Sequence, residues 1–218
     1  MSQCKALMVR RGEDKSISHQ IETIKIDDLP ADGDVLVAVE FSTVNYKDGL
    51  CLSGKGGLVR TYPHIPGIDF AGEVVDSKDP RYAPGEKVVL TGWRVGEIWW
   101  GGYAQYARVK ADWLVPLPDG LSCQQAMAVG TAGITAMLSV LALERHGVTC
   151  EDGQILVTGA GGGVGSLATV LLSAAGFEVA AVTGRSEMTP YLQRLGASTI
   201  IDRNSLMDGD SKPLMSAQ

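Results

Sequence analysis

The sequence is poor in the residues that build metal sites and disulfide frameworks. It contains four cysteines and three histidines among 218 residues, and no two cysteines have C-x-x-C spacing. Only His146 stands within four residues of a cysteine, and one such pair is too few ligands, so the pattern predicts no metal centre. Isolated cysteines are typical of free thiols in a reducing compartment, and the first five residues lack the pattern of a secretion signal. We therefore expect a cytoplasmic protein. The residues concerned are Cys4, Cys51, Cys123, Cys150, His19, His64 and His146.

The chain also lacks an excess of positive charge and a long uninterrupted apolar run. Its formal net charge of −6 argues against non-specific binding of nucleic acid. The longest apolar stretch, residues 126–143, favours a buried helix over a membrane span because small and polar residues interrupt it. These are Gly130, Thr131, Gly133, Thr135 and Ser139. We expect a small-molecule partner, with no role for nucleic acid or membrane.

Short strands separated by Gly and Pro turns dominate residues 1–120, which predicts a β-rich, partly closed barrel. The pattern changes after residues 116–120 (Pro-Leu-Pro-Asp-Gly), so residues 121–218 form a second predicted domain of α/β type. The strands expected in the first domain are 6–9, 21–26, 35–41, 70–76, 87–91, 103–109 and 113–115, with a helix at 46–52. In the second domain we expect helices at 122–126, 135–144, 164–175 and 190–195.

A glycine-rich turn organises the second domain. A short apolar strand at 155–157 precedes it and the helix at 164–175 follows it, as at the start of a dinucleotide-binding βαβ unit. Glycines allow the backbone to approach a pyrophosphate, which the free N–H groups of the helix start can bind. One departure is that alanine holds the first glycine position of G-x-G-x-x-G. The predicted cofactor-binding residues of this turn are Ala160, Gly162, Gly163, Val164 and Gly165.

The end of the next strand, residues 178–182, predicts which cofactor is bound. Sites that prefer NAD carry an Asp or Glu there, which accepts a hydrogen bond from the ribose 2′-hydroxyl. This chain has Thr183, Gly184 and Arg185 instead. A hydroxyl and a guanidinium suit a 2′-phosphate, so the sequence predicts NADPH, with Thr183 and Arg185 as ligands. The alternative is that Arg185 is an ordinary surface residue.

The three parallel strands expected at 155–157, 178–182 and 199–202 lie on one side of a doubly wound sheet. The apolar first strand would then be an edge, although such strands are normally central. We therefore expect the nucleotide-binding domain to be incomplete, as the first half of a doubly wound (Rossmann) domain in a truncated chain.

Several motifs together resemble the medium-chain dehydrogenase/reductase superfamily. Within it they are most similar to the zinc-free, quinone-oxidoreductase-like branch and its acryloyl-CoA reductases. The resemblance covers residues 4–218 and implies a GroES-like fold for the β-rich domain. Where the superfamily's zinc enzymes carry their ligands, this chain has Asn45, Ile68 and the region of Gly130 and Thr131. The motifs are residues 42–48 (Ser-Thr-Val-Asn-Tyr-Lys-Asp), 65–72 (Ile-Pro-Gly-Ile-Asp-Phe-Ala-Gly), 91–97 (Thr-Gly-Trp-Arg-Val-Gly-Glu), 100–102 (Trp-Gly-Gly), 130–133 (Gly-Thr-Ala-Gly) and 182–185 (Val-Thr-Gly-Arg).

The resemblance implies reduction of the C=C bond of a small α,β-unsaturated acyl-CoA by NADPH, in a parent protein that is a homodimer. Asn45 and Tyr46 fall where the family has its active-site cleft. Tyr46 is the expected proton or hydrogen-bond donor, or else a residue packed on the cleft wall, and Asn45 is expected to orient a carbonyl. Thr131 is expected to contact the cofactor, and Asp69 to be structural. An NADPH:quinone reductase and a non-catalytic NADPH-binding protein remain alternatives.

The tryptophans near residues 91–102 have two possible roles. Related sequences often carry histidine where Trp99 stands, so a contact of this position with substrate would alter specificity. Trp93, Trp99 and Trp100 either form a wall of the substrate pocket or are buried under another segment.

Overall fold

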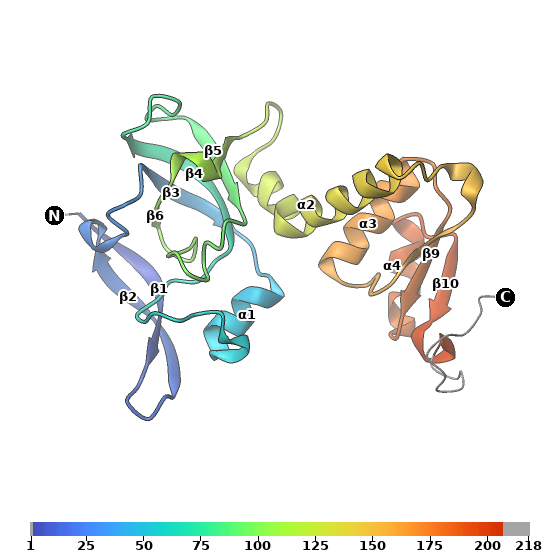
Figure 1. Cartoon of the computed structure of the whole chain (residues 1–218), viewed down its shortest axis with the longest axis horizontal. Coiled ribbons are helices and arrows are strands. Elements are labelled where there is room, and N and C mark those ends of the chain that lie inside the picture. The colour runs from blue at the N-terminus through green and yellow to red at the C-terminus, as the bar shows by residue number, and fades with distance from the viewer. Residues whose placement is uncertain (1, 207–218) are drawn as a thin grey trace. The chain divides into compact units, whose positions relative to one another are not determined.

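The computed structural model describes residues 2–206 and divides the chain into two compact units, Met1–Thr131 and Ala132–Gln218 (Figure 1). The division falls inside helix α2 (Cys123–Arg145), eleven residues beyond the domain boundary expected at residue 120. The difference has a packing cause: Cys123 and Met127, in the first turns of α2, form a buried cluster with Ala71 of the first unit.

The first unit is built on a five-stranded antiparallel sheet in the order β6-β3-β4-β5-β7. Alternate residues of its strands point inward, and Val35, Val37, Phe70, Val88 and Leu90 form the centre of its core. The sheet thus confirms the β-rich domain expected from the Gly and Pro turns. Its strands are β3 (Val35–Ser42), β4 (Asp69–Ser77), β5 (Lys87–Thr91), β6 (Tyr106–Val109) and β7 (Leu114–Pro116).

A separate hairpin of β1 (Gln3–Arg11) and β2 (Ile17–Lys25) completes the β structure of this unit. Backbone bonds from Leu7 N to Tyr103 O, 2.8 Å, and from Val9 N to His64 O, 2.7 Å, attach it to the rest. Ala6 and Met8 are buried against Ile65. The hairpin therefore adds a second, smaller core beside the sheet.

The helices of the chain begin and end at residues that fit helix ends. The first helix, α1 (Tyr46–Ser53), follows Asn45 and ends at Gly54, whose φ of +67° suits a left-handed C-terminal cap. In α2, Gly130 leaves helical geometry with φ +48° and ψ −157°, so the two helices expected from the sequence are joined across a break. Six short 3-10 helices lie in the described connections: Ile26–Asp28, Lys55–Gly57, Ala111–Trp113, Cys150–Asp152, Ser186–Met188 and Arg203–Leu206.

The apolar character of α2 is only partly explained by burial. By length and composition this helix is apolar enough to cross a membrane, and 33% of its most apolar window is buried. Leu138 is 61% exposed, and Ile134 and Met137 are also exposed among the described residues. The expectation of a buried helix therefore holds for one face of α2, which carries Ala136 and Val140.

The second unit contains a parallel sheet in the order β10-β9-β8. Val157, Val179, Ala181, Leu172 and Leu192 form its core. Among the described strands β8 is an edge, as expected from the one-sided strand order, and its Leu156 is 53% exposed although apolar strands of this kind are normally central. The elements are β8 (Ile155–Val157), α3 (Gly163–Ala174), β9 (Val179–Thr183), α4 (Thr189–Arg194) and β10 (Thr199–Asp202).

The buried His64 makes the stability of the first unit depend on pH. Burial lowers the pKa of His64 below its ordinary value of 6.5, against the opposing effect of a hydrogen bond at the backbone of Gly96. A lowered folded-state pKa means that the unfolded chain binds a proton first, so stability is full above pH 6.5 and is lost as the pH falls through the folded-state pKa. One such proton changes the free energy of unfolding by at most about 1.4 kcal/mol per pH unit.

We expect His64→Leu to flatten this acid limb, whatever it does to stability at neutral pH. The exposed His19 offers a matched control, and His19→Gln should leave the slope unchanged. The measurement is urea unfolding between about pH 5 and pH 8, the range in which histidine changes charge. Tryptophan fluorescence reports the first unit, because Trp93, Trp99, Trp100 and Trp113 all lie in it. Equal slopes for the wild type and His64→Leu would contradict the prediction.

Candidate active site and cofactor-binding turn

A buried polar cluster centres on Asp69, the first residue of β4, which is 0% exposed. Its Oδ1 accepts a hydrogen bond from the Thr43 hydroxyl at 2.5 Å. Its Oδ2 accepts from the backbone N–H of Thr131 at 2.9 Å and from Asn45 Nδ2 at 3.3 Å. A buried carboxylate with three donors is well satisfied, and it ties three segments together. The structure thus confirms the structural role expected for Asp69 and adds a second one, the orientation of Asn45.

Hydrogen bonding fixes which way the Asn45 carboxamide points. Its Nδ2 donates to Thr43 Oγ1 at 2.6 Å as well as to Asp69. The Thr43 hydroxyl donates its one hydrogen to Asp69, so its oxygen must accept from Asn45. The Asp69 carboxylate can also only accept. Both contacts therefore require the amide nitrogen of Asn45. The role of Asn45 in orienting a carbonyl stays a prediction.

The break at Gly130 brings Thr131 to this cluster. A Cβ on Gly130 would lie 3.1 Å from Asp69 Oδ2 and 3.1 Å from Thr43 Cγ2, and its φ of +48° is one that other residues rarely adopt. Glycine is thus needed at this position for both space and conformation. The structure places Thr131 beside Asn45 through their shared partner Asp69; its contact with a cofactor stays a prediction.

Asp48 and Tyr46 begin helix α1 and differ sharply in exposure. Asp48 is buried, and its carboxylate accepts from the backbone N–H groups of Asn45 at 2.9 Å and Ile68 at 3.0 Å. Burial raises the pKa of Asp48, and these two bonds oppose that shift. Tyr46 is 86% exposed, so its ring does not pack on a wall formed by the described residues. Its hydroxyl is accessible, and its role as proton donor stays a prediction.

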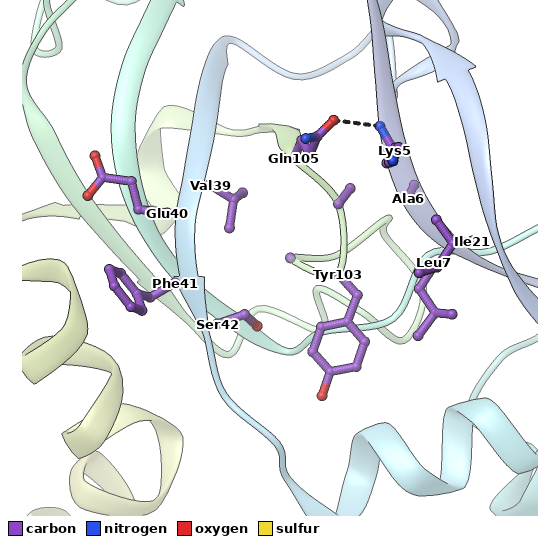
Figure 2. A pocket seen from close by; sticks show the side chains of 12 residues that line it. Lys5, Ala6, Leu7, Ile21, Val39, Glu40, Phe41, Ser42, Tyr103 and Gln105 are labelled. Carbon is purple, nitrogen blue, oxygen red and sulfur yellow. Dashed lines mark hydrogen bonds between the residues drawn. The ribbon is translucent and has the colours of Figure 1, made fainter.

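A hollow of about 400 Å³ lies in the first unit between β1, β3 and residues 102–105 (Figure 2). Tyr103 lines it, and the Tyr103 hydroxyl donates to Thr43 O at 2.8 Å, which links the hollow to the Asp69 cluster. Burial raises the pKa of Tyr103. Neither Asn45 nor Tyr46 lines this hollow. Sequence reasoning missed Tyr103, because its contact with Thr43 joins residues 60 positions apart.

The tryptophans of the first unit mostly pack on its core. Trp99 meets Trp113 edge to face with ring centroids 5.0 Å apart, and its Nε1 donates to Arg108 O at 2.8 Å. Trp93 stacks on Trp113 at 6.3 Å but stays exposed. Trp100 packs beside the β1–β2 hairpin and donates to Pro63 O at 3.2 Å. For Trp99 and Trp100 the structure therefore supports burial under other segments, in preference to a wall of a substrate pocket.

Residues 91–97 form a strained loop that an ion-pair network holds. Trp93 and Arg94 have φ of +54° and +58°, which is unusual for residues other than glycine. The buried Glu97 pairs with Arg94 at 2.7 Å and with Lys47 of α1 at 3.3 Å. Arg94, with the help of Lys47, lowers the pKa of Glu97. These contacts join the loop to the helix that carries Tyr46.

The glycine-rich turn of the second unit has the close approaches that a dinucleotide needs. A Cβ on Gly165 would lie 2.7 Å from Ala160 Cα and nearer still to Gly159 O. No side chain caps the start of α3, so the first N–H groups of this helix have no side-chain acceptor among the described residues. Ala160 N donates to Val182 O at 3.2 Å, and its methyl group is buried in the core. This burial explains why alanine is tolerated at the first glycine position.

Thr183 and Arg185 lie at the carboxyl end of β9, as predicted. Thr183 Oγ1 accepts from Arg185 N at 3.1 Å, and Arg185 Nη2 donates to Gly161 O at 3.0 Å. The guanidinium therefore lies across the glycine-rich turn. The turn offers backbone N–H groups and the end of β9 offers a cation and a hydroxyl, so these residues fit a phosphorylated dinucleotide. Within residues 2–206, no group of three His, Cys, Asp or Glu residues could hold a metal ion.

Comparison with known proteins agrees with this arrangement. Residues 31–119 match the alcohol dehydrogenase GroES-like domain. The fold and the motifs together are similar to those of the medium-chain dehydrogenase/reductase superfamily.

Three relatives are informative. Acrylyl-CoA reductase AcuI of Ruegeria pomeroyi is 60% identical over 97% of this chain and 64% of the relative. The putative quinone oxidoreductase YhfP of Bacillus subtilis is 48% identical over 98% of this chain and 64% of the relative. Its solved structure, with NAD bound, has a TM-score of 0.93 and covers 100% of this chain and 66% of that one.

The third relative is the yhdH oxidoreductase of Salmonella enterica, solved in complex with NADP. It is 50% identical, with a TM-score of 0.92 over 97% of this chain and 64% of that one. The chain thus spans about two thirds of the length of these relatives. Their similarity to both units supports the expected pairing of a GroES-like domain with part of a Rossmann domain.

Proposed function

We propose that this protein is an NADPH-dependent reductase of the C=C bond of a small α,β-unsaturated acyl-CoA, converting acryloyl-CoA to propionyl-CoA. The observation that carries the proposal is the 60% identity, over 97% of the chain, to a relative named acrylyl-CoA reductase. The exposed Tyr46 hydroxyl and the fixed Asn45 carboxamide, on residues of one short segment, support a polar site in the first unit.

NADPH is the proposed cofactor because Thr183 and Arg185 stand where an NAD site has an acidic residue. The Salmonella enterica relative was solved with NADP and the Bacillus subtilis relative with NAD. The relatives therefore differ in the cofactor they were solved with, and the choice for this chain depends on its own residues. An arginine can bind a phosphate through two parallel hydrogen bonds.

When bound, NADPH supplies a hydride, which reaches the β-carbon of the substrate. Negative charge then develops on the thioester oxygen, and a hydrogen-bond donor near that oxygen stabilises it. The Tyr46 hydroxyl is the donor we assign to this task, or to delivery of a proton to the α-carbon. We assign Asn45, which precedes Tyr46 in the sequence, to positioning the substrate, with its carboxamide held by Thr43 and Asp69.

A quinone reductase is the second candidate, favoured by the 48% identity to a putative quinone oxidoreductase. The discriminating experiment follows NADPH oxidation by its absorbance, with acryloyl-CoA and with a benzoquinone as substrates. We expect a higher kcat/KM for acryloyl-CoA, and a lower kcat for Tyr46→Phe, by about 10²-fold or more if the hydroxyl transfers the proton. Preference for the quinone would contradict the acyl-CoA proposal. Cofactor binding without turnover of either substrate would favour a non-catalytic NADPH-binding protein.

We also infer a homodimeric parent protein in the cytoplasm. The free thiols of all four cysteines support a reducing compartment. The exposed apolar edge strand β8 supports a sheet that continues in the whole protein. Light scattering of the full-length protein tests the dimer.

A further inference from the structure

A second arginine lies beside the proposed 2′-phosphate site. Strand β10 pairs in parallel with β9, and Asp202 is the register partner of Thr183. The residue after Asp202 is therefore brought to the same edge as Gly184, although the two are far apart in the sequence. That residue is Arg203. A Cβ built on Gly184 would lie 2.8 Å from Arg203 Nη2, 2.9 Å from Cζ and 3.1 Å from Nε.

Gly184 leaves the space that the Arg203 guanidinium occupies. Its φ is not among the positive values of this chain, so other residues are compatible with its backbone conformation. The requirement for glycine is therefore one of space: a methyl group there would displace the guanidinium. Since Arg185 directly follows Gly184, the Arg203 guanidinium fills the side-chain space of the residue next to Arg185.

The charges of the two arginines are not neutralised by carboxylates in the described part of the second unit. No ion pair forms within residues 132–206, where Arg185 donates to the carbonyl of Gly161. Of the neighbouring acids, Glu187 is exposed, and Asp202 Oδ1 accepts from the backbone N–H of Asn204 at 2.9 Å. Two cations thus lie near the carboxyl ends of adjacent parallel strands, which is where such folds bind ligands.

We propose that Arg203 binds the 2′-phosphate of NADPH together with Arg185, and that Gly184 provides the space that makes this two-arginine site possible. The inference rests on the proposed NADPH specificity. A 2′-phosphate carries close to two negative charges and three acceptor oxygens, so it can bind two guanidinium groups at once. NADH has only a hydroxyl at this position, and Arg203 adds nothing to its binding.

The test uses the 218-residue chain and measures the binding of 2′,5′-ADP and 5′-AMP by calorimetry. These two probes differ in the 2′-phosphate alone, and NADPH and NADH are measured in parallel. We expect Arg203→Gln to weaken 2′,5′-ADP and NADPH about tenfold, a typical loss for one charge-assisted contact, and to leave 5′-AMP and NADH unchanged. Arg185→Gln should behave in the same way. Arg194→Gln, an exposed arginine at the end of α4, is the matched control and should change nothing.

Gly184→Ala provides an independent variant. The added methyl group meets only the flexible end of Arg203, so we expect the fold to be retained and 2′,5′-ADP to bind more weakly by a smaller factor. Unchanged binding of 2′,5′-ADP to both Arg203→Gln and Gly184→Ala would overturn the proposal, as would equal losses for 2′,5′-ADP and 5′-AMP. A wild-type chain that binds both probes equally would instead refute the NADPH specificity itself, and the Arg203 proposal with it.

Discussion

Asp69→Ala is expected to lower the free energy of unfolding of the first unit by about 3–5 kcal/mol, as when one partner of a buried polar network is removed. The substitution leaves the Thr43 hydroxyl, the Asn45 amide and the Thr131 N–H without their shared acceptor. Each buried donor left unpaired costs roughly 1–3 kcal/mol. The total stays below the simple sum, because Asn45 and Thr43 are half-buried and water can reach part of the cluster.

Two further variants separate the contribution of the Asp69 hydrogen bonds to stability from the effect of removing a negative charge. Asp69→Asn keeps the shape but turns an N–H group toward one of the three donors, so we expect a smaller loss of about 2–3 kcal/mol. Asp76→Asn makes the same chemical change at an exposed position of the same strand, and it should stay within about 0.5 kcal/mol of the wild type. Denaturant unfolding followed by tryptophan fluorescence measures all three, because every tryptophan lies in the first unit.

The result also bears on the site, because Asp69 holds the nitrogen of the Asn45 carboxamide inward. If Asp69→Ala and Asp76→Asn were equally stable, the cluster would contribute nothing to the fold. A stable Asp69→Asn chain with altered substrate KM and unchanged kcat would point instead to a role in binding through Asn45.

Local patterns were enough to predict most elements of this fold. Strands at 87–91, 155–157 and 199–202 have the bounds found for β5, β8 and β10. Their apolar runs end at Gly, Pro or Asp residues, and such signals need no knowledge of distant contacts. The two helices expected at 122–126 and 135–144 are joined as α2, because the chain continues as helix after the break at Gly130.

The role of Asp69 was harder to predict, because two of its donors come from the segment between β3 and α1 and the third comes from the break in α2. No spacing rule connects residues 43, 45, 69 and 131, and only the folded sheet brings them together. The same holds for Arg203, which reaches Gly184 through the parallel register of β9 and β10. The orientation of Asn45 likewise depends on a hydrogen-bond network that no sequence pattern encodes.

For Arg185, the sequence predicted the position of the residue but not its contact. Its position at the end of β9 followed from counting residues after a predicted strand, and the structure confirms that position. Its contact with Gly161 was not predictable, since it requires the glycine-rich turn and the end of β9 to lie side by side. The sequence thus predicted where the Arg185 guanidinium lies, and only the fold shows that it donates to the Gly161 carbonyl.

The glycine-rich turn gives the second large effect: Gly165→Ala is expected to destabilise the second unit by about 3 kcal/mol, near the upper end of the range for overpacking. The added methyl group would meet Gly159 O and would lie 2.7 Å from Ala160 Cα, and neither backbone atom can rotate away as a side chain can. To make room, α3 must move away from the turn that follows β8. We therefore also expect the affinity for NADPH to fall at least tenfold, because the N–H groups at the start of α3 move with the helix.

Gly163→Ala is the matched control on the same turn. A Cβ there would lie 3.4 Å from the Ala132 methyl group, an ordinary contact, and alanine favours the helix that begins at this residue. Its stability should match or slightly exceed that of the wild type. Hydrogen exchange of the β8 and α3 amides measures both variants locally, while tryptophan fluorescence should show the first unit unchanged in each. Wild-type exchange rates in Gly165→Ala would mean that the turn can relax around a methyl group, and the close approach of α3 to β8 would then not be what requires glycine at residue 165.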